Sequence, residues 1–168
     1  MPGAADAILL LACGVATYTD MKDGKIPNGI TAPLMMAGLL LNLIDGALVF
    51  ALLGLAFAFV IHFSLWAAGV VKGGDAKLMM GVGAVIGWRE VLETTLWQFV
   101  LFAPVGLVFL AMVGRLGNFF ETLKWFSFKV RGVEYPKPDQ QTWMIKAPII
   151  LAAVYVSRLT NLLGTEAL

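Results

Sequence analysis

The sequence has few of the residues that a metal centre, a disulfide or a charged surface requires. Its 168 residues include one cysteine, Cys13, and one histidine, His62, which excludes an internal disulfide and a Cys-rich metal module. Charged residues make up only 14% of the chain, whereas hydrophobic residues make up 60%. Soluble domains carry about 25% charged residues, so this composition indicates a membrane protein.

Three long runs contain no Asp, Glu, Lys or Arg: residues 26–44, 46–71 and 94–114. Each reaches the roughly 20 residues that a helix needs to cross a bilayer. We therefore predict a membrane-spanning helix in each run.

Three further runs are weaker candidates. Residues 4–19 and 143–163 are apolar except near their ends, where long basic side chains can reach the membrane surface. The short run 76–88 lies between two strong spans and must also cross if neighbouring helices alternate in direction. The sequence thus predicts an all-α polytopic membrane protein of about six transmembrane helices, forming a single domain over residues 1–168.

The basic residues fall mostly on one side of the predicted membrane. Ten of the twelve Lys and Arg residues lie in or beside the first, third and fifth loops, and only Arg89 and Arg158 lie opposite. Because cytoplasmic loops are enriched in Lys and Arg, these three loops are predicted to be cytoplasmic and both termini to be outside. The first residues, MPGAAD, include no basic residue, so we expect no cleavable signal peptide.

The longest segment between predicted spans, residues 115–142, has two parts. Leu116, Phe119, Phe120 and Leu123 recur at offsets of three and four residues, followed by aromatic and basic residues up to Arg131. This pattern predicts an interfacial amphipathic helix in the last cytoplasmic loop. The stretch EYPKPDQQ that follows contains two prolines and is expected to be irregular.

The acids that border the predicted spans divide into two groups. The outer ends of the spans carry Asp6, Asp45, Glu90 and Glu93, and the cytoplasmic ends carry Asp20, Asp23 and Asp75. Two distant stretches of the chain therefore place acids on the cytoplasmic side.

Asp75 and Asp20 each have a simple structural explanation. Asp75 can cap the helix that follows it, with the two glycines before it forming the turn. Asp20 can be a solvated acid at a helix end, paired with Lys22, Lys25 or a neighbouring loop. The C-terminus of a helix disfavours negative charge, however, so we expect another contact to hold Asp20 in place.

Two aspartates brought together at the membrane edge could also act on a peptide bond. Like charges a few ångströms apart cannot both ionise, so the pair shares one proton and can hold a water molecule. The ionised member would take a proton from the water as it attacks a carbonyl, and the protonated member would donate to the developing oxyanion. This is aspartic peptidase chemistry, which requires no metal and no cofactor.

Two stretches of the sequence resemble the signatures of the type IV prepilin peptidases, a family that includes the archaeal preflagellin peptidases. In the first, TDMKDGKIPN, Asp20 precedes Ile26, Pro27 and Asn28. The second, KGGDAKLMMGVGAVIGW, is similar to a Gly-x-Gly-Asp motif followed by x-Lys-Leu and a glycine-rich helix. Its matching residues are Gly74, Asp75, Lys77, Leu78, Gly83, Gly87 and Trp88. One position departs from the family, because Lys72 stands in the place of the first motif glycine.

The resemblance implies a role for each matched residue. Asp20 and Asp75 would be the catalytic pair. Asp23 is a reserve candidate on its spacing alone, because it lies three residues from Asp20 and could share a helix face with it. The residues expected to support them are Ile26, Pro27, Asn28, Gly73, Gly74 and Lys77. Gly83 and Gly87 are expected to let their helix approach a neighbour closely.

The resemblance also implies a reaction and a location. The protein would be an aspartic endopeptidase of the cytoplasmic (inner) membrane, with its active site facing the cytoplasm. It would remove the short leader from a prepilin or pilin-like precursor. Longer relatives carry a Cys-rich insertion and also methylate the new N-terminus; without paired cysteines, this chain resembles the short form that acts as a peptidase only. The expected partners are the precursor and the lipid bilayer, with no nucleic acid, metal or cofactor.

A second interpretation stays open at this point. Asp20 and Asp75 could bind a proton or cation in a small ion-coupled transporter, or the protein could be a non-catalytic assembly factor. Transport sites usually lie near the middle of the membrane, whereas these two acids are expected at one edge.

Overall fold

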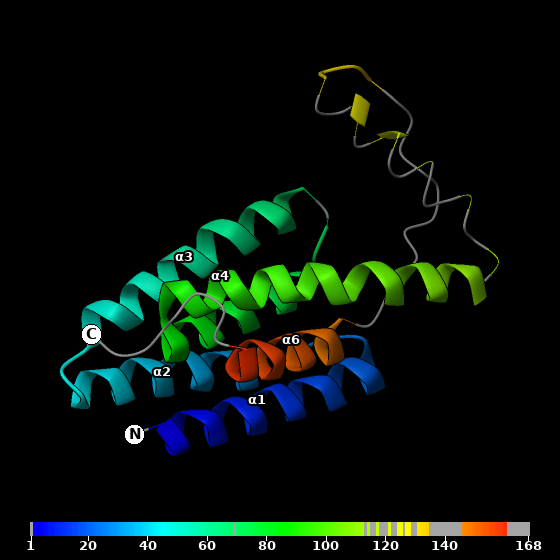
Figure 1. Ribbon diagram of the computed structural model, residues 1–168. Helices are drawn as coiled ribbons and strands as arrows, with labels where there is room; N and C mark the ends of the chain where they lie inside the picture. The colour runs from blue at the N-terminus through cyan, green and yellow to red at the C-terminus, as the bar shows by residue number, and fades with distance from the viewer. Residues whose placement is uncertain are drawn as a thin grey trace. The chain divides into compact units, whose positions relative to one another are not determined.

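The computed structural model describes residues 2–68, 70–112, 131–134 and 146–160, together with residues 114, 117, 121, 124, 125, 127 and 128. Its helices are α1 (Pro2–Asp23), α2 (Asn28–Ile44), α3 (Leu48–Ala67), α4 (Gly73–Met112) and α6 (Ala147–Thr160) (Figure 1). No strand occurs among these described residues, so the predicted all-α fold is confirmed for this part of the chain.

The helices have the length and composition of a membrane protein. Three stretches are long and apolar enough to cross a bilayer: Gly3–Asp23, Leu48–Ala67 and Gly73–Val108. The apolar helices α2 and α6 are shorter. Large apolar side chains such as Leu11 and Val49 are exposed on the helices, as expected for a surface that faces lipid. The chain is a helical membrane protein, and the predicted number of six crossings stays a prediction.

The chain divides into two compact units, one formed by Met1–Phe99 with Ile145–Leu168 and the other by Val100–Met144. In the first unit, α1 packs against α2 and α6, and α2 packs against α3. Buried side chains of α1, α4 and α6, among them Cys13 and Leu78, form one hydrophobic core. The single domain predicted over the whole chain stays a prediction.

The helix α4 is interrupted at Gly87, whose φ of 78° and ψ of 177° lie outside the helical region. A positive φ favours glycine, and a Cβ at this position would also overlap the ring of Phe50. Figure 1 shows the chain turning back at this break. The predicted spans 76–88 and 94–114 therefore correspond to two helical segments on either side of Gly87. The sequence pointed to Gly87 only as a packing residue, so the break is a new finding.

Small residues let the first segment of α4 approach α2 and α3 closely. A Cβ added to Gly83 would lie 2.5 Å from the carbonyl oxygen of Gly54, and one added to Gly38 would lie 2.7 Å from the carbonyl carbon of Ala84. Such contacts exist only because glycine has no side chain. The prediction that Gly83 permits a close helix approach is confirmed, and the neighbour is α3.

Charged side chains of the first unit gather in two separate clusters. Near the start of α1, Arg158 pairs with Asp6 at 2.6 Å and with Glu90 at 2.7 Å. Asp20 and Asp75 lie together in the other cluster, near the end of α1. Asp6 and Glu90 thus lie apart from Asp20 and Asp75, and the predicted division of all seven acids between the two sides of the membrane stays a prediction.

The interfacial amphipathic helix predicted after residue 115 lies mostly outside the described residues, and so does most of EYPKPDQQ. The described residues in the helical part, all of them helical, are Gly117, Glu121, Lys124, Trp125, Ser127 and Phe128. Lys124 pairs with Glu121 at 3.0 Å. The amphipathic helix and the irregular loop stay predictions.

Replacing Gly54 by alanine should destabilise the helix bundle, because the added methyl would collide with the backbone of Gly83. Overpacking of this kind costs about 1–3 kcal/mol, which corresponds to a fall of roughly 2–12 °C in the unfolding temperature. Circular dichroism of the protein in detergent micelles measures this temperature. Gly14→Ala is the matched control, since nothing lies within 4 Å of a Cβ at Gly14. Equal unfolding temperatures for the two variants would contradict the packing described.

Candidate active site

The two sequence motifs meet in space through their supporting residues. Lys77 in α4 donates a hydrogen bond to Oδ1 of Asn28, the first residue of α2, at 2.9 Å. Pro27 directly precedes α2 with an extended backbone, φ −71° and ψ 148°. Ile26, one residue earlier, is buried against the start of α4. These contacts fix the loop between α1 and α2 against the first turns of α4.

The paired glycines before Asp75 are not equivalent. A Cβ added to Gly74 would lie 3.1 Å from the Cβ of Ile26, so a larger side chain would push the two motifs apart. A Cβ added to Gly73 would make only an ordinary contact of 3.5 Å with the ring of Trp66. Position 74 is therefore tightly packed, whereas position 73 has room for a side chain.

Asp20 lies in the last turn of α1 and is only 1% exposed. Its Oδ2 accepts hydrogen bonds from the backbone N–H groups of Lys146 at 3.0 Å and Ala147 at 3.2 Å. These residues form the N-terminus of α6, where free N–H groups and the helix dipole favour an anion. The additional contact that we expected to hold Asp20 in place is therefore the N-terminus of α6. The alternative of a solvated acid paired with Lys22 or Lys25 is wrong, because Asp20 is buried and both lysines are exposed.

Asp75 lies in the first turn of α4 and is also 1% exposed. Its Oδ2 accepts a hydrogen bond from the backbone N–H of Lys72, the residue before the helix, at 3.2 Å. This is half of a capping box, in which Asp75 lies inside the helix and bonds back to the residue before it. The prediction that Asp75 is the N-cap is therefore wrong, because Lys72 occupies that position. The Oδ1 of Asp75 is buried and has no hydrogen-bond partner among the described residues. Because an unpaired buried oxygen costs free energy, a water or substrate group bound there would be favourable.

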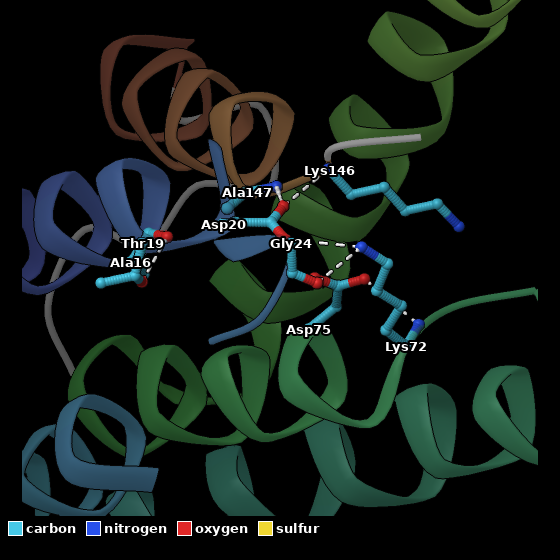
Figure 2. A network of polar contacts seen from close by, with 8 residues as sticks. All are labelled: Ala16, Thr19, Asp20, Gly24, Lys72, Asp75, Lys146 and Ala147. Atoms are coloured by element: carbon cyan, nitrogen blue, oxygen red, sulfur yellow. Dashed lines mark hydrogen bonds and ion pairs between the residues drawn. The ribbon is translucent and has the colours of Figure 1, made fainter. Parts of the chain in front are cut away.

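Lys72 contacts both aspartates. Its Nζ lies 3.5 Å from Oδ1 of Asp20 and donates a hydrogen bond to the carbonyl oxygen of Gly24 at 3.0 Å. Figure 2 shows the carboxyl groups of Asp20 and Asp75 beside this lysine. The position at which the sequence departs from the family's glycine therefore places an ammonium group in the site.

Lys146 adds a second ammonium group to the cluster. Its Nζ donates a hydrogen bond to the carbonyl oxygen of Val70, and its charge interacts with those of Asp75, Asp20 and Lys72. Figure 2 shows the side chain of Lys146 extending away from the two carboxyl groups, so its charge acts on them from a distance, whereas Lys72 contacts Asp20 directly. No group of three or more His, Cys, Asp or Glu side chains that could hold a metal ion occurs within the residues described above.

Lys146 and Ala147 are site residues that the sequence did not reveal. The available signal was Pro148, because proline is favoured in the first turn of a helix and so marks the start of α6. No local pattern indicates, however, that this start faces Asp20. In contrast, the reserve candidate Asp23 is exposed at the end of α1 and lies outside the buried cluster.

Comparison with known proteins extends the resemblance beyond the two motifs. Residues 7–107 match the model of the type IV leader peptidase family. The prepilin leader peptidase/N-methyltransferase of Burkholderia pseudomallei (strain 1026b) is 35% identical over 101 residues, which cover 53% of this chain and 32% of that protein. The prepilin peptidase EppA of Methanothermobacter thermautotrophicus is 35% identical over 92 residues, which cover 51% of this chain and 24% of that protein. No solved structure matches the chain significantly.

The matches cover only part of the relatives. Another prepilin leader peptidase/N-methyltransferase, from Aeromonas hydrophila, is 32% identical over 120 residues, which cover 64% of this chain and 41% of that protein. On this chain, however, the family model covers more than half of the residues, and the matched segment includes Asp20 and Asp75. The family predicted from the two motifs is thereby confirmed: the chain belongs to the type IV leader peptidase family.

Proposed function

We propose that this chain is a membrane aspartic endopeptidase that removes the short cytoplasmic leader from prepilin-like precursors. The main support is the meeting of two buried carboxyl groups, Asp20 and Asp75, from motifs far apart in the sequence. Membership of the type IV leader peptidase family supports the same activity. We call these two residues the aspartate pair.

The surroundings of the aspartate pair support different roles for its members. Asp20 accepts two backbone hydrogen bonds from the N-terminus of α6, and we assign it the role of general base. Asp75 has one backbone donor, and its Oδ1 has no hydrogen-bond partner among the described residues. This oxygen is suited to hold the proton that a general acid donates.

Peptide hydrolysis then follows with these two groups. A water molecule between the carboxyls gives a proton to Asp20 while its oxygen bonds to the carbonyl carbon, and Asp75 gives its proton to the carbonyl oxygen. When the tetrahedral intermediate breaks its C–N bond, the proton on Asp20 passes to the leaving amine. Asp75 recovers its proton as the carbonyl group forms again. One water is consumed, and both carboxyls return to their initial states.

The proposed setting is the cytoplasmic face of the inner membrane, with six spans in a single domain and both termini outside. The two lysines beside the aspartate pair, Lys72 and Lys146, support this orientation through the positive-inside rule. A site at this edge can reach a peptide bond just outside the hydrocarbon, where a cytoplasmic leader meets the apolar helix of its precursor. The bilayer would hold that helix, so the enzyme need position only the residues around the scissile bond.

An ion- or proton-coupled transporter is the alternative for a membrane protein with paired carboxyls. The location of the pair favours the peptidase, because Asp20 ends α1 and Asp75 begins α4, whereas transport sites usually lie near the midplane. The methyl transfer in the names of two relatives is not proposed for this chain, because the cluster supplies an acid and a base for hydrolysis.

Replacing either member of the aspartate pair by asparagine should stop leader removal. General acid–base groups contribute about 10²–10⁴-fold, so Asp20→Asn and Asp75→Asn should each lower the cleavage rate at least 100-fold. Purified membranes incubated with a prepilin and examined by mass spectrometry measure the released leader. In Asp20→Asn the side-chain amide would keep one acceptor oxygen for the N-terminus of α6, so folding should be retained.

The matched control for these variants is Asp23→Asn, which changes an exposed acid three residues from Asp20. Its cleavage rate should stay close to that of the unaltered protein. Normal leader removal by a well-folded Asp20→Asn or Asp75→Asn variant would rule out the proposed mechanism.

The proposed orientation can be tested with single cysteines introduced into a Cys13→Ala background. Asp23→Cys should react with a membrane-impermeant maleimide only after the cells are opened, because residue 23 is placed on the cytoplasmic side. Asp45→Cys, at the other end of α2, should react in intact cells. Equal labelling of both positions in intact cells would contradict the crossing of α2, and the reverse pattern would contradict the orientation.

A further inference from the structure

Lys72 is a charged residue with a defined position that the proposed hydrolysis does not use. Its side chain is 20% exposed and makes contact with Asp20, which is almost completely buried. The family motif quoted above has glycine at this position, so the ammonium group is an addition made by this chain. A flexible lysine at a membrane edge could extend into water, yet this one points into the site (Figure 2).

The ammonium group is held by acceptors on α1. Gly24 ends that helix with a φ of 64°, and its N–H bonds to the carbonyl oxygen of Asp20 at 2.9 Å. The carbonyl oxygen of Gly24 then accepts a hydrogen bond from Nζ of Lys72 at 3.0 Å. The backbone N–H of the same lysine bonds to Asp75 at 3.2 Å. One residue thus contacts both members of the aspartate pair and the end of α1.

We propose that Lys72 is a positioning residue, an internal counterion of the aspartate pair that moves the pH range of leader cleavage downwards. The inference rests on the proposed peptidase function. The role proposed for Lys72 depends on its positive charge and not only on its hydrogen bonds to the backbone.

The charged groups around the pair determine the direction of the effect. Asp20 on α1 faces Lys72 and the backbone of Lys146, and Asp75 on α4 interacts with the charges of Lys146, Asp20 and Lys72. Of the other charged residues nearby, Lys77 bonds to Asn28, and the exposed ones are Lys22, Asp23 and Lys25. Among the described residues, Lys72 is therefore the lysine whose side-chain ammonium has a direct contact with Asp20, and Lys146 would remain after its removal.

A cation beside a carboxyl pair makes both carboxyls lose their protons at lower pH. The base must be ionised for cleavage, so the acidic limb of the pH profile lies lower with Lys72 than without it. The acid must be protonated, so the alkaline limb also lies lower. Removing the charge should therefore move both limbs to higher pH.

The deciding experiment compares the pH profiles of leader cleavage for Lys72→Met, Lys72→Arg and the unaltered protein. Methionine keeps the apolar length without the charge, and its profile should move up by about 1–3 pH units, the range produced by a cation within a few ångströms. Arginine keeps the charge, and its profile should stay within a few tenths of a unit. Lys22→Met is the matched control at an exposed lysine of α1 and should leave the profile in place.

The outcomes separate this inference from the proposed function. No cleavage by the unaltered protein at any pH would overturn the peptidase itself. Cleavage with coinciding profiles for Lys72→Met and the unaltered protein, or a shift to lower pH, would overturn only the counterion role. A shift shared by Lys72→Arg would also overturn it, because the positive charge would then not be the cause.

A second measurement does not depend on activity or on the folding of Lys72→Met. In protein labelled with ¹⁵N-lysine, the Nζ resonance of Lys72, assigned by its loss in Lys72→Arg, should change with pH in step with the acidic limb. It should lose that response in Asp20→Asn. A resonance that is constant across the acidic limb would overturn the proposal.

Discussion

The site depends on the burial of the Asp20 carboxylate against the first turn of α6. A buried charge is costly unless hydrogen bonds or an opposite charge replace water. Here two backbone N–H groups at a helix N-terminus and the ammonium group of Lys72 replace it. The same contact holds the end of α1 beside the start of α6, as expected for two helices that pack along each other. This contact therefore fixes the position of Asp20, next to which Asp75 lies.

Asp75 is positioned in a different way, by close packing of backbone. Gly83 contacts Gly54 and Gly38 contacts Ala84 at distances that exclude a Cβ, and Gly74 packs tightly on Ile26. Such contacts hold the first segment of α4 through van der Waals packing, which is the main force between helices in lipid. The carboxyl at its start is therefore placed without needing polar partners on both oxygens. This is consistent with the absence of a hydrogen-bond partner for Oδ1 of Asp75 among the residues that the structure describes.

Lys72 and Lys146 are positively charged residues that interact with the two carboxyl groups of the aspartate pair. Two carboxyls in a dry site must share a proton when no cation is near, because their repulsion is strong. Two ammonium groups in the same cluster reduce that repulsion. The protonation of the pair is then set by residues from the loop before α4 and from the start of α6, in addition to the two aspartates themselves.

Composition and motif spacing were sufficient for the fold class and for naming the two aspartates, because membrane helices and short motifs are local properties of a segment. They could not identify the partner of Asp20, since residues 20, 72 and 146 are far apart in the sequence and meet only through the packing of α1, α4 and α6. Nor could spacing separate Asp20 from Asp23: both belong to α1, and only the packing of α6 and α4 decides that the first is buried and the second exposed.

The sequence by itself therefore determined where helices form and which acids border them, because hydrophobicity over a stretch of about 20 residues decides insertion into lipid. The tertiary structure alone decided the positive φ at Gly87, the hydrogen bonds that the N-terminus of α6 donates to Asp20, and the position of the Lys72 ammonium group. These features depend on distances between segments that are remote in the chain, and no local pattern of residues records such distances.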